Sequence, residues 1–123
     1  MPVSMLSGAA WPRFLTSILA SSSNARVAAL ADGFQPAVVR LIQMVVEAAH
    51  ARGKWVGVCG EMGGDPLAVP LLVGLGVDEL SMNAPAIPKA KQIIRALDFA
   101  SAQAVARSAL KAESAQAVQA LLS

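Results

Sequence analysis

The sequence predicts an α/β fold in which parallel strands alternate with helices. The segment from Lys54 to Asp65 opens with an apolar run rich in β-branched residues and ends in a glycine cluster, a pattern that indicates a buried strand and its turn. A second short strand is expected from Glu79 to Met82. Segments with helical periodicity precede, separate and follow the two strands. Because two strands cannot close a barrel, the sheet is expected to be open.

Composition excludes several classes of protein. A length of 123 residues suits one domain, and ten basic against eight acidic residues give a net charge of +2, too balanced to indicate nucleic acid or an anionic membrane as a partner. The single cysteine excludes an intramolecular disulfide and is typical of the reducing cytoplasm, where we expect the protein. The longest apolar run, from Pro66 to Val77, is shorter than the roughly 20 residues of a membrane span.

Residues 1–23 differ from the rest of the chain. They contain one charged residue, Arg13, and end in three serines. A short apolar segment after an arginine is a feature of signal peptides, but here the basic residue comes late, so we expect an uncleaved N-terminus. We interpret residues 1–23 as an aberrant or disordered leader.

The first predicted helix runs from Pro36 to Arg52. Proline suits the first helical position, and Gly53 is placed to end the helix. His50, in its last turn, is expected to be a capping or surface residue rather than a catalytic base. Five residues at three- and four-residue spacing are expected to form the buried face: Val38, Leu41, Ile42, Val45 and Ala49.

Four more helices are expected after the glycine cluster. The first, with Asp65 as a cap, begins at Pro66, or nearer Ala68 because Pro70 would otherwise remove a backbone hydrogen bond. The remaining three are a helix opened by Pro88 with the apolar face Ala90, Ile93, Ile94 and Leu97, a helix from Phe99 to Lys111 capped by Asp98, and a helix to Leu122 capped by Ser114.

Cys59 is the most prominent candidate for chemistry. It shares a strand face with Trp55 and Gly57 and lies at the carboxyl end of the strand, where α/β proteins place functional groups. From spacing alone, a small apolar side chain that fills the core is an equal alternative. His50 lies on the preceding helix, near the opposite rim, so a cysteine hydrolase is not favoured. The residues around Cys59 also lack the ligand spacing of a structural zinc site.

The motif Val58-Cys59-Gly60-Glu61, followed by Gly64-Asp65 and then by Pro70 to Met82, is specific. It resembles the phosphoenolpyruvate-binding domain of phosphoenolpyruvate-protein phosphotransferases, which are Enzyme I of the bacterial sugar phosphotransferase system and also occur within multiphosphoryl transfer proteins. The resemblance runs from about Asn24 to about Leu97. It implies that residues 24–123 are a C-terminal fragment of a TIM barrel, comprising its last two βα units and C-terminal helices.

The resemblance also implies a reaction. Similar proteins use Mg²⁺ to transfer the phosphoryl group of phosphoenolpyruvate to their own histidine, and then to a histidine-containing phosphocarrier protein. Cys59 would be the acid that protonates the enolate of pyruvate, and Gly60, Glu61, Gly63 and Gly64 would bind the substrate. For Glu61, orienting the loop through backbone N–H groups is an equal alternative.

The family pattern is absent just upstream of Asn24. The asparagine-aspartate and aspartate-arginine pairs expected there are replaced by Ser21, Ser22 and other residues. We therefore expect a truncated, inactive gene product that lacks the metal ligands and the phosphohistidine domain. The alternative function is a non-catalytic fragment or interaction module derived from the same domain. Relatives form homodimers, and the resemblance extends this partner prediction to the present chain.

Overall fold

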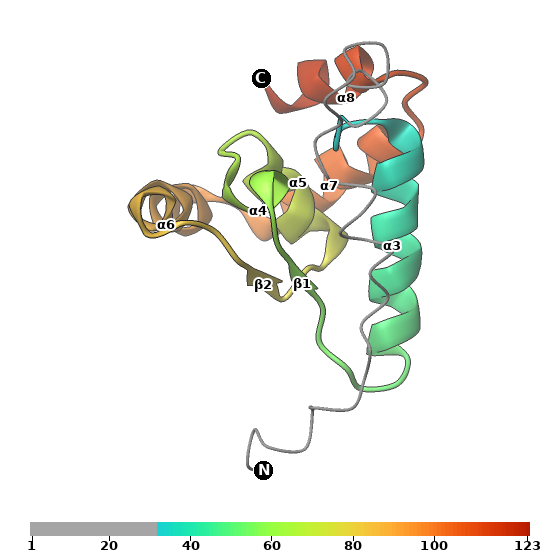
Figure 1. Cartoon of the computed structure of the whole chain (residues 1–123). Coiled ribbons are helices and arrows are strands. Elements are labelled where there is room, and N and C mark those ends of the chain that lie inside the picture. The colour runs from blue at the N-terminus through green and yellow to red at the C-terminus, as the bar shows by residue number, and fades with distance from the viewer. Residues whose placement is uncertain (1–31) are drawn as a thin grey trace, which may run out of the picture.

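The computed structural model describes residues 32–123, which form a small parallel sheet and the helices that pack against it (Figure 1). The expectations for residues 1–23 and for Asn24 lie outside this range. Within it, no helix is long and apolar enough to cross a membrane. The elements, in chain order, are α3 (Pro36–His50), β1 (Gly57–Val58), α4 (Glu61–Gly64), α5 (Ala68–Leu75), β2 (Glu79–Leu80), η3 (Ala84–Ala86), α6 (Ile87–Ala96), α7 (Phe99–Leu110) and α8 (Ala115–Leu122).

Strands β1 and β2 pair in parallel, as the sequence predicts. Gly57 lies opposite Glu79, and Val58 lies opposite Leu80. Both strands are shorter than expected, with two residues each. Each strand has one neighbour within residues 32–123, so the ladder is limited to the few bonds that this pair can form.

One face of the sheet is covered, and the other is open. Val58 and Leu80 pack against the hydrophobic core, and Val56, just before β1, is also buried. On the opposite face, Trp55 is 56% exposed, and Cys59 is exposed as well. The expectation of a buried first strand is therefore correct for only one of its two faces.

Helix α5 forms the centre of the core. Its side chains include Leu71 and Leu72, which are fully buried, and the helix contacts α3, α4, α6, α7 and α8. It begins at Ala68, the later of the two predicted starts. The prediction of Asp65 as its cap is wrong, because the N-cap is Leu67 and no side chain caps the helix. The Asp65 side chain instead accepts a hydrogen bond from the backbone N–H of Leu67 at 2.9 Å, in the turn before the helix.

Helix α3 ends two residues earlier than predicted and buries a different face. The five residues expected to face the core are only half-buried, and the fully buried positions in the body of the helix are Val39 and Val46. Helix α3 contacts both α5 and α7, and Val39 belongs to the same core cluster as Leu71 and Leu72 of α5. The neighbouring helices therefore decide which part of the apolar surface of α3 is covered. Arg40 adds a polar contact to this packing, since its guanidinium donates to the carbonyl oxygens of Leu110 and Ala112.

The predicted helix caps after the sheet are confirmed. The Asp98 side chain accepts from the backbone N–H of Ser101 at the start of α7, and Ser114 accepts from that of Ala117 at the start of α8. Helix α6 begins at Ile87, one residue before the predicted Pro88, because the 3₁₀ turn η3 leads directly into it. In Figure 1, α3 and α6 lie on opposite sides of the sheet.

A cluster of hydrogen bonds joins the end of α3 to the amino ends of both strands. Asp78 Oδ2 lies 2.8 Å from His50 Nε2 and 2.8 Å from the backbone nitrogen of Val56, whose N–H donates to it. The hydrogen bond with His50, followed by the bond from Val56, lowers the pKa of Asp78 below its ordinary value of 3.8. His50 is thus a surface residue, as expected, with a structural partner.

We expect the Asp78 cluster to stabilise the fold in its ionised form. The folded-state pKa lies below the unfolded value, so the stabilisation is present above the unfolded pKa and is lost as pH falls through the folded pKa. In urea unfolding, Asp78→Asn should be less stable than the unsubstituted chain at neutral pH, and the difference should shrink in acid. A difference that is constant across this pH range would contradict the assignment.

Large apolar side chains remain exposed on several helices. Ile87 and Ile94 on α6 are 39% and 42% exposed, and Phe99 at the start of α7 is 53% exposed. We expect the 123-residue chain by itself to self-associate, because exposed large apolar side chains and open strand edges favour association. Sedimentation velocity over a range of concentrations tests this expectation. A concentration-independent monomer with a sharp thermal transition would contradict it.

Candidate functional site

The segment after β1 is a short helix rather than the irregular glycine turn expected from the sequence. Glu61–Gly64 forms α4, and Gly60 precedes it with φ of +86°, a backbone conformation that favours glycine. Gly63 N–H donates to the carbonyl of Gly60 at 3.2 Å, which closes the turn. Glycine is unfavourable inside a helix, but both glycines of α4 lie close to residues of the strand ends and the following loop, and these contacts stabilise the helix.

Three of the five predicted site residues are accessible. Cys59 follows the last residue of β1 at its carboxyl end, and its side chain is exposed. Gly60 and Glu61 are also exposed, and a Cβ atom added to Gly60 would meet no atom within 4 Å. The thiol, a backbone amide and a carboxylate are therefore presented together on the chain segment that leaves the sheet.

The other two predicted site residues face the protein. A Cβ atom on Gly63 would lie 2.5 Å from the carbonyl oxygen of Ser81 and 2.9 Å from that of Val58, so α4 approaches the ends of both strands closely. A Cβ atom on Gly64 would lie 3.1 Å from Cβ of Met82. The absence of a side chain at these positions thus serves internal packing, and substrate contact by Gly63 and Gly64 stays a prediction.

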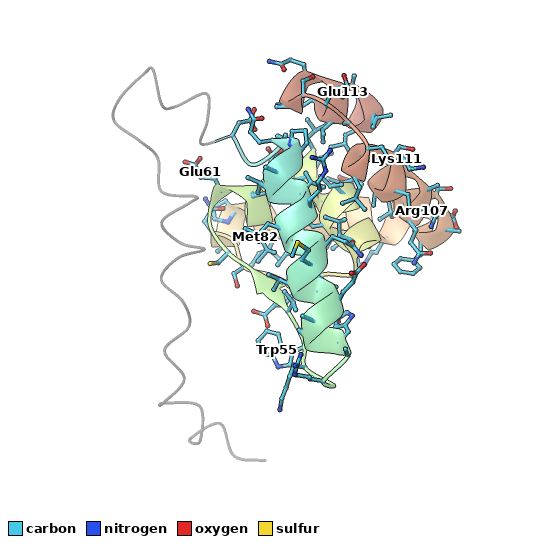
Figure 2. All side chains as sticks on the ribbon, turned by 90° about the vertical axis from the view of Figure 1, so that its right-hand side faces the viewer. Trp55, Glu61, Met82, Arg107, Lys111 and Glu113 are labelled. Atoms are coloured by element: carbon cyan, nitrogen blue, oxygen red, sulfur yellow. The ribbon has the colours of Figure 1, made fainter. Side chains whose placement is uncertain are left out.

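The two rims of the sheet carry different groups. Figure 2 shows Trp55 at the lower end of the structure, with Glu61 and Met82 well above it. His50 and its partner Asp78 lie at the amino ends of the strands, whereas Cys59 follows the carboxyl end of β1. The chain does not bring His50 and Cys59 together as a catalytic pair.

Sequence reasoning did not single out Ser81 and Glu79 as parts of this region. Both side chains are exposed, and the hydroxyl of Ser81 donates to Oε1 of Glu79 at 3.3 Å. Glu79 pairs with Gly57, which lies on the same strand face as Cys59. The alternation of residues along β2 was the available signal, because it places Glu79 and Ser81 on one face and Leu80 on the other.

The described residues do not fit a metal ion. Within residues 32–123, no three His, Cys, Asp or Glu side chains are grouped so that they could hold one. A Mg²⁺ site needs several oxygen ligands in octahedral geometry.

Comparison with known sequences decides the family. The profile of the PEP-binding domain of PEP-utilising enzymes matches residues 15–99, which include both strands and the Cys59 segment. The chain belongs to this family. A multiphosphoryl transfer protein of Escherichia coli O6:H1 is 49% identical over 100 residues, covering 81% of this chain and 12% of the relative.

Two phosphoenolpyruvate-protein phosphotransferases are similar to the same degree. The protein of Listeria monocytogenes is 46% identical over 99 residues, covering 80% of this chain and 17% of the relative. The protein of Staphylococcus carnosus is 52% identical over 79 residues, covering 64% of this chain and 14% of the relative. The chain thus spans between 12% and 17% of the length of these relatives.

Proposed function

We propose that this chain supplies the part of a phosphoenolpyruvate-binding site that contains Cys59. We also propose that it functions in phosphoryl transfer from phosphoenolpyruvate to a protein histidine. The observation that carries the proposal is the exposed thiol at the carboxyl end of a parallel strand, in a segment about half identical to multiphosphoryl transfer proteins. A histidine-containing phosphocarrier protein is the proposed onward acceptor. The cytoplasm is the proposed location.

The proposed role of Cys59 is that of a general acid. When the phosphoryl group leaves phosphoenolpyruvate, the bond between its phosphorus and the enol oxygen breaks, and the enolate of pyruvate remains. The Cys59 thiol gives its proton to C3 of this enolate, which forms pyruvate, and the thiolate then regains a proton from water. An ordinary thiol has a pKa near 8.5 and is mostly protonated at neutral pH, so it suits this task.

Glu61 and Gly60 support this chemistry in the proposal. The Gly60 backbone has open space around it, so a small anion can approach closely. Glu61 is exposed in the first turn of α4, next to the thiol in the chain. Orientation of the Cys59–Glu61 segment and direct contact with the substrate are the two roles that we propose for this carboxylate.

We further propose that β1 and β2 are the last two strands of a TIM barrel. Their parallel pairing through the helical crossover α5 supports this, as does the division of the sheet into a helix-covered face and an open face. In a barrel, the open face with Trp55 and Cys59 would be turned inward, and the carboxyl ends of the strands would form the active-site rim.

The proposed function can be tested by a chimera. In the Escherichia coli multiphosphoryl transfer protein, the matched segment of 100 residues is replaced by that of this chain. The chimera should become labelled on histidine by radioactive phosphoenolpyruvate and should pass the label to the phosphocarrier. A chimera that folds like the parent protein yet gains no label would refute the proposal.

A binding module is the second candidate function. The exposed apolar side chains of α6 and α7, including Ile94 and Phe99, favour it, because such surfaces commonly form interfaces. The same chimera distinguishes the two functions. A module that only binds would assemble without supporting phosphoenolpyruvate-dependent labelling.

A further inference from the structure

The pairing of the two strands places Ser81 beside Cys59. Val58 lies opposite Leu80, so the next residues along the two chains are Cys59 and Ser81. The Ser81 N–H donates to the Val58 carbonyl at 2.8 Å, so the pairing continues up to this level. Paired strands lie about 4.8 Å apart, and residues at one level of a parallel pair project from the same face. The hydroxyl and the thiol are therefore neighbours on the open face of the sheet.

The hydroxyl of Ser81 has an acceptor that it can exchange. It donates to Oε1 of Glu79 at 3.3 Å, which is long for a bond between a hydroxyl and a carboxylate. Both side chains are exposed, so water competes for this bond. Rotation of the serine side chain and its O–H group is sufficient to direct the proton to another acceptor.

Ser81 differs in chemistry from the other polar side chains near the thiol. Glu61 begins α4 two residues after Cys59, and Glu79 lies one alternation further back along β2. An ionised carboxylate only accepts hydrogen bonds, whereas a hydroxyl also donates one. Negative charge on sulfur is stabilised by a donor. Of these three side chains, Ser81 is therefore the one that can stabilise a thiolate at position 59.

We propose that Ser81 is a positioning residue for Cys59, and that its hydroxyl turns from Glu79 to the sulfur as the thiol gives up its proton. In this step the S–H bond breaks, a C–H bond forms at C3 of the enolate, and the electron pair of the S–H bond stays on sulfur. The O–H bond of Ser81 remains intact and only changes its acceptor. A donor held next to developing charge lowers the barrier of the step in which that charge forms. This inference rests on the proposed function and deepens it.

The first test uses the full 123-residue chain. Cys59 is its only cysteine, so alkylation by iodoacetamide, which reacts with the thiolate, reports on this residue alone. Removing the donor in Ser81→Ala should leave less thiolate at a given pH. The midpoint of the pH profile of alkylation should move to higher pH by about half a unit, and the rate at neutral pH should fall about threefold. An unchanged profile in Ser81→Ala overturns the proposal.

Two further variants separate the hydroxyl from its surroundings. Ser81→Thr keeps the hydroxyl on a residue that suits a strand, so it should retain the unsubstituted profile. Ser108→Ala removes another exposed hydroxyl, on α7, which donates to the Ala104 carbonyl at 3.2 Å, and it should also retain the profile. A shift in either variant as large as that in Ser81→Ala would assign the effect to packing or to general stability and overturn the proposal.

The second test measures the reaction in the chimera. Ser81→Ala should lower the rate of deuterium exchange into C3 of pyruvate by about tenfold, the effect of losing one hydrogen bond to a charged group, with little change in the KM for pyruvate. Ser81→Thr should restore the exchange. Full exchange in Ser81→Ala overturns the proposal. A chimera that gains no histidine label refutes the proposed function instead, and the alkylation profile of the 123-residue chain then decides whether Ser81 supports the thiolate.

Discussion

Replacing Cys59 with alanine in the chimera should lower deuterium exchange into C3 of pyruvate by a factor on the order of 10² to 10⁴, the range typical for loss of a general acid. Exchange at C3 requires the enolate to be formed and protonated repeatedly, which is the step assigned to the thiol. Phosphoryl transfer is a separate step. Labelling of the histidine by phosphoenolpyruvate in a single turnover should therefore persist in Cys59→Ala.

Cys59→Ser provides the matched variant. Serine has nearly the shape of cysteine, but a hydroxyl is a much weaker acid than a thiol with a pKa near 8.5, so serine should be almost as damaging as alanine. If serine retained most of the exchange, the size of the side chain rather than its acidity would be important. Full exchange in Cys59→Ala would show that the thiol only packs, the alternative that its spacing leaves open.

Gly74→Ala should destabilise the folded chain by about 3 kcal/mol or more, because it overpacks the contact between α5 and α7. A Cβ atom at this position would lie 2.2 Å from the carbonyl oxygen of Ala102 and 3.1 Å from Cβ of Ala106. Alanine would otherwise favour a helix interior by about 1 kcal/mol relative to glycine. The clash with a backbone atom outweighs this gain, so the net effect is a loss.

Urea unfolding of Gly74→Ala, with Gly53→Ala as the matched control, measures this effect. Gly53 also becomes alanine, but it has no atom within 4 Å of the added Cβ, and its φ of +64° accounts for a smaller loss of about 1–2 kcal/mol. Equal losses in the two variants would show that α5 and α7 can separate without penalty. Such a result would contradict the close helix contact.

The local pattern of residues was sufficient to predict most of the elements. Asp98 and Ser114 were recognised as caps because the oxygen of such a side chain accepts a bond from a backbone N–H within the next few residues, an interaction that needs no distant partner. Pro70 likewise indicated the later start of α5. The motif around Cys59 indicated the family, which the comparison with the PEP-binding domain confirms.

Contacts between distant residues decided what the pattern could not. The sequence predicted another set of residues, beginning with Val38, as the buried face of α3, but Val39 and Val46 are the buried side chains in the body of this helix. The apolar stripe of α3 is wide, and the position of the neighbouring helices determines which part of it is covered. The length of β1 was overestimated for a similar reason. A strand extends only as far as a neighbour supplies hydrogen bonds, and β2 supplies few.

The sequence by itself determined the alternation of strands and helices, the caps of α7 and α8, and the place of the thiol at the end of the first strand. These features depend on backbone propensities and on neighbours within a few residues. Only the tertiary structure showed that Gly60 and Gly63 differ in environment. Gly60 is open to solvent, whereas Gly63 lies against the carbonyl groups of Val58 and Ser81. Three glycines in one motif look equivalent in a sequence. The sequence does not show which distant backbone atoms lie close to each of them in the folded chain.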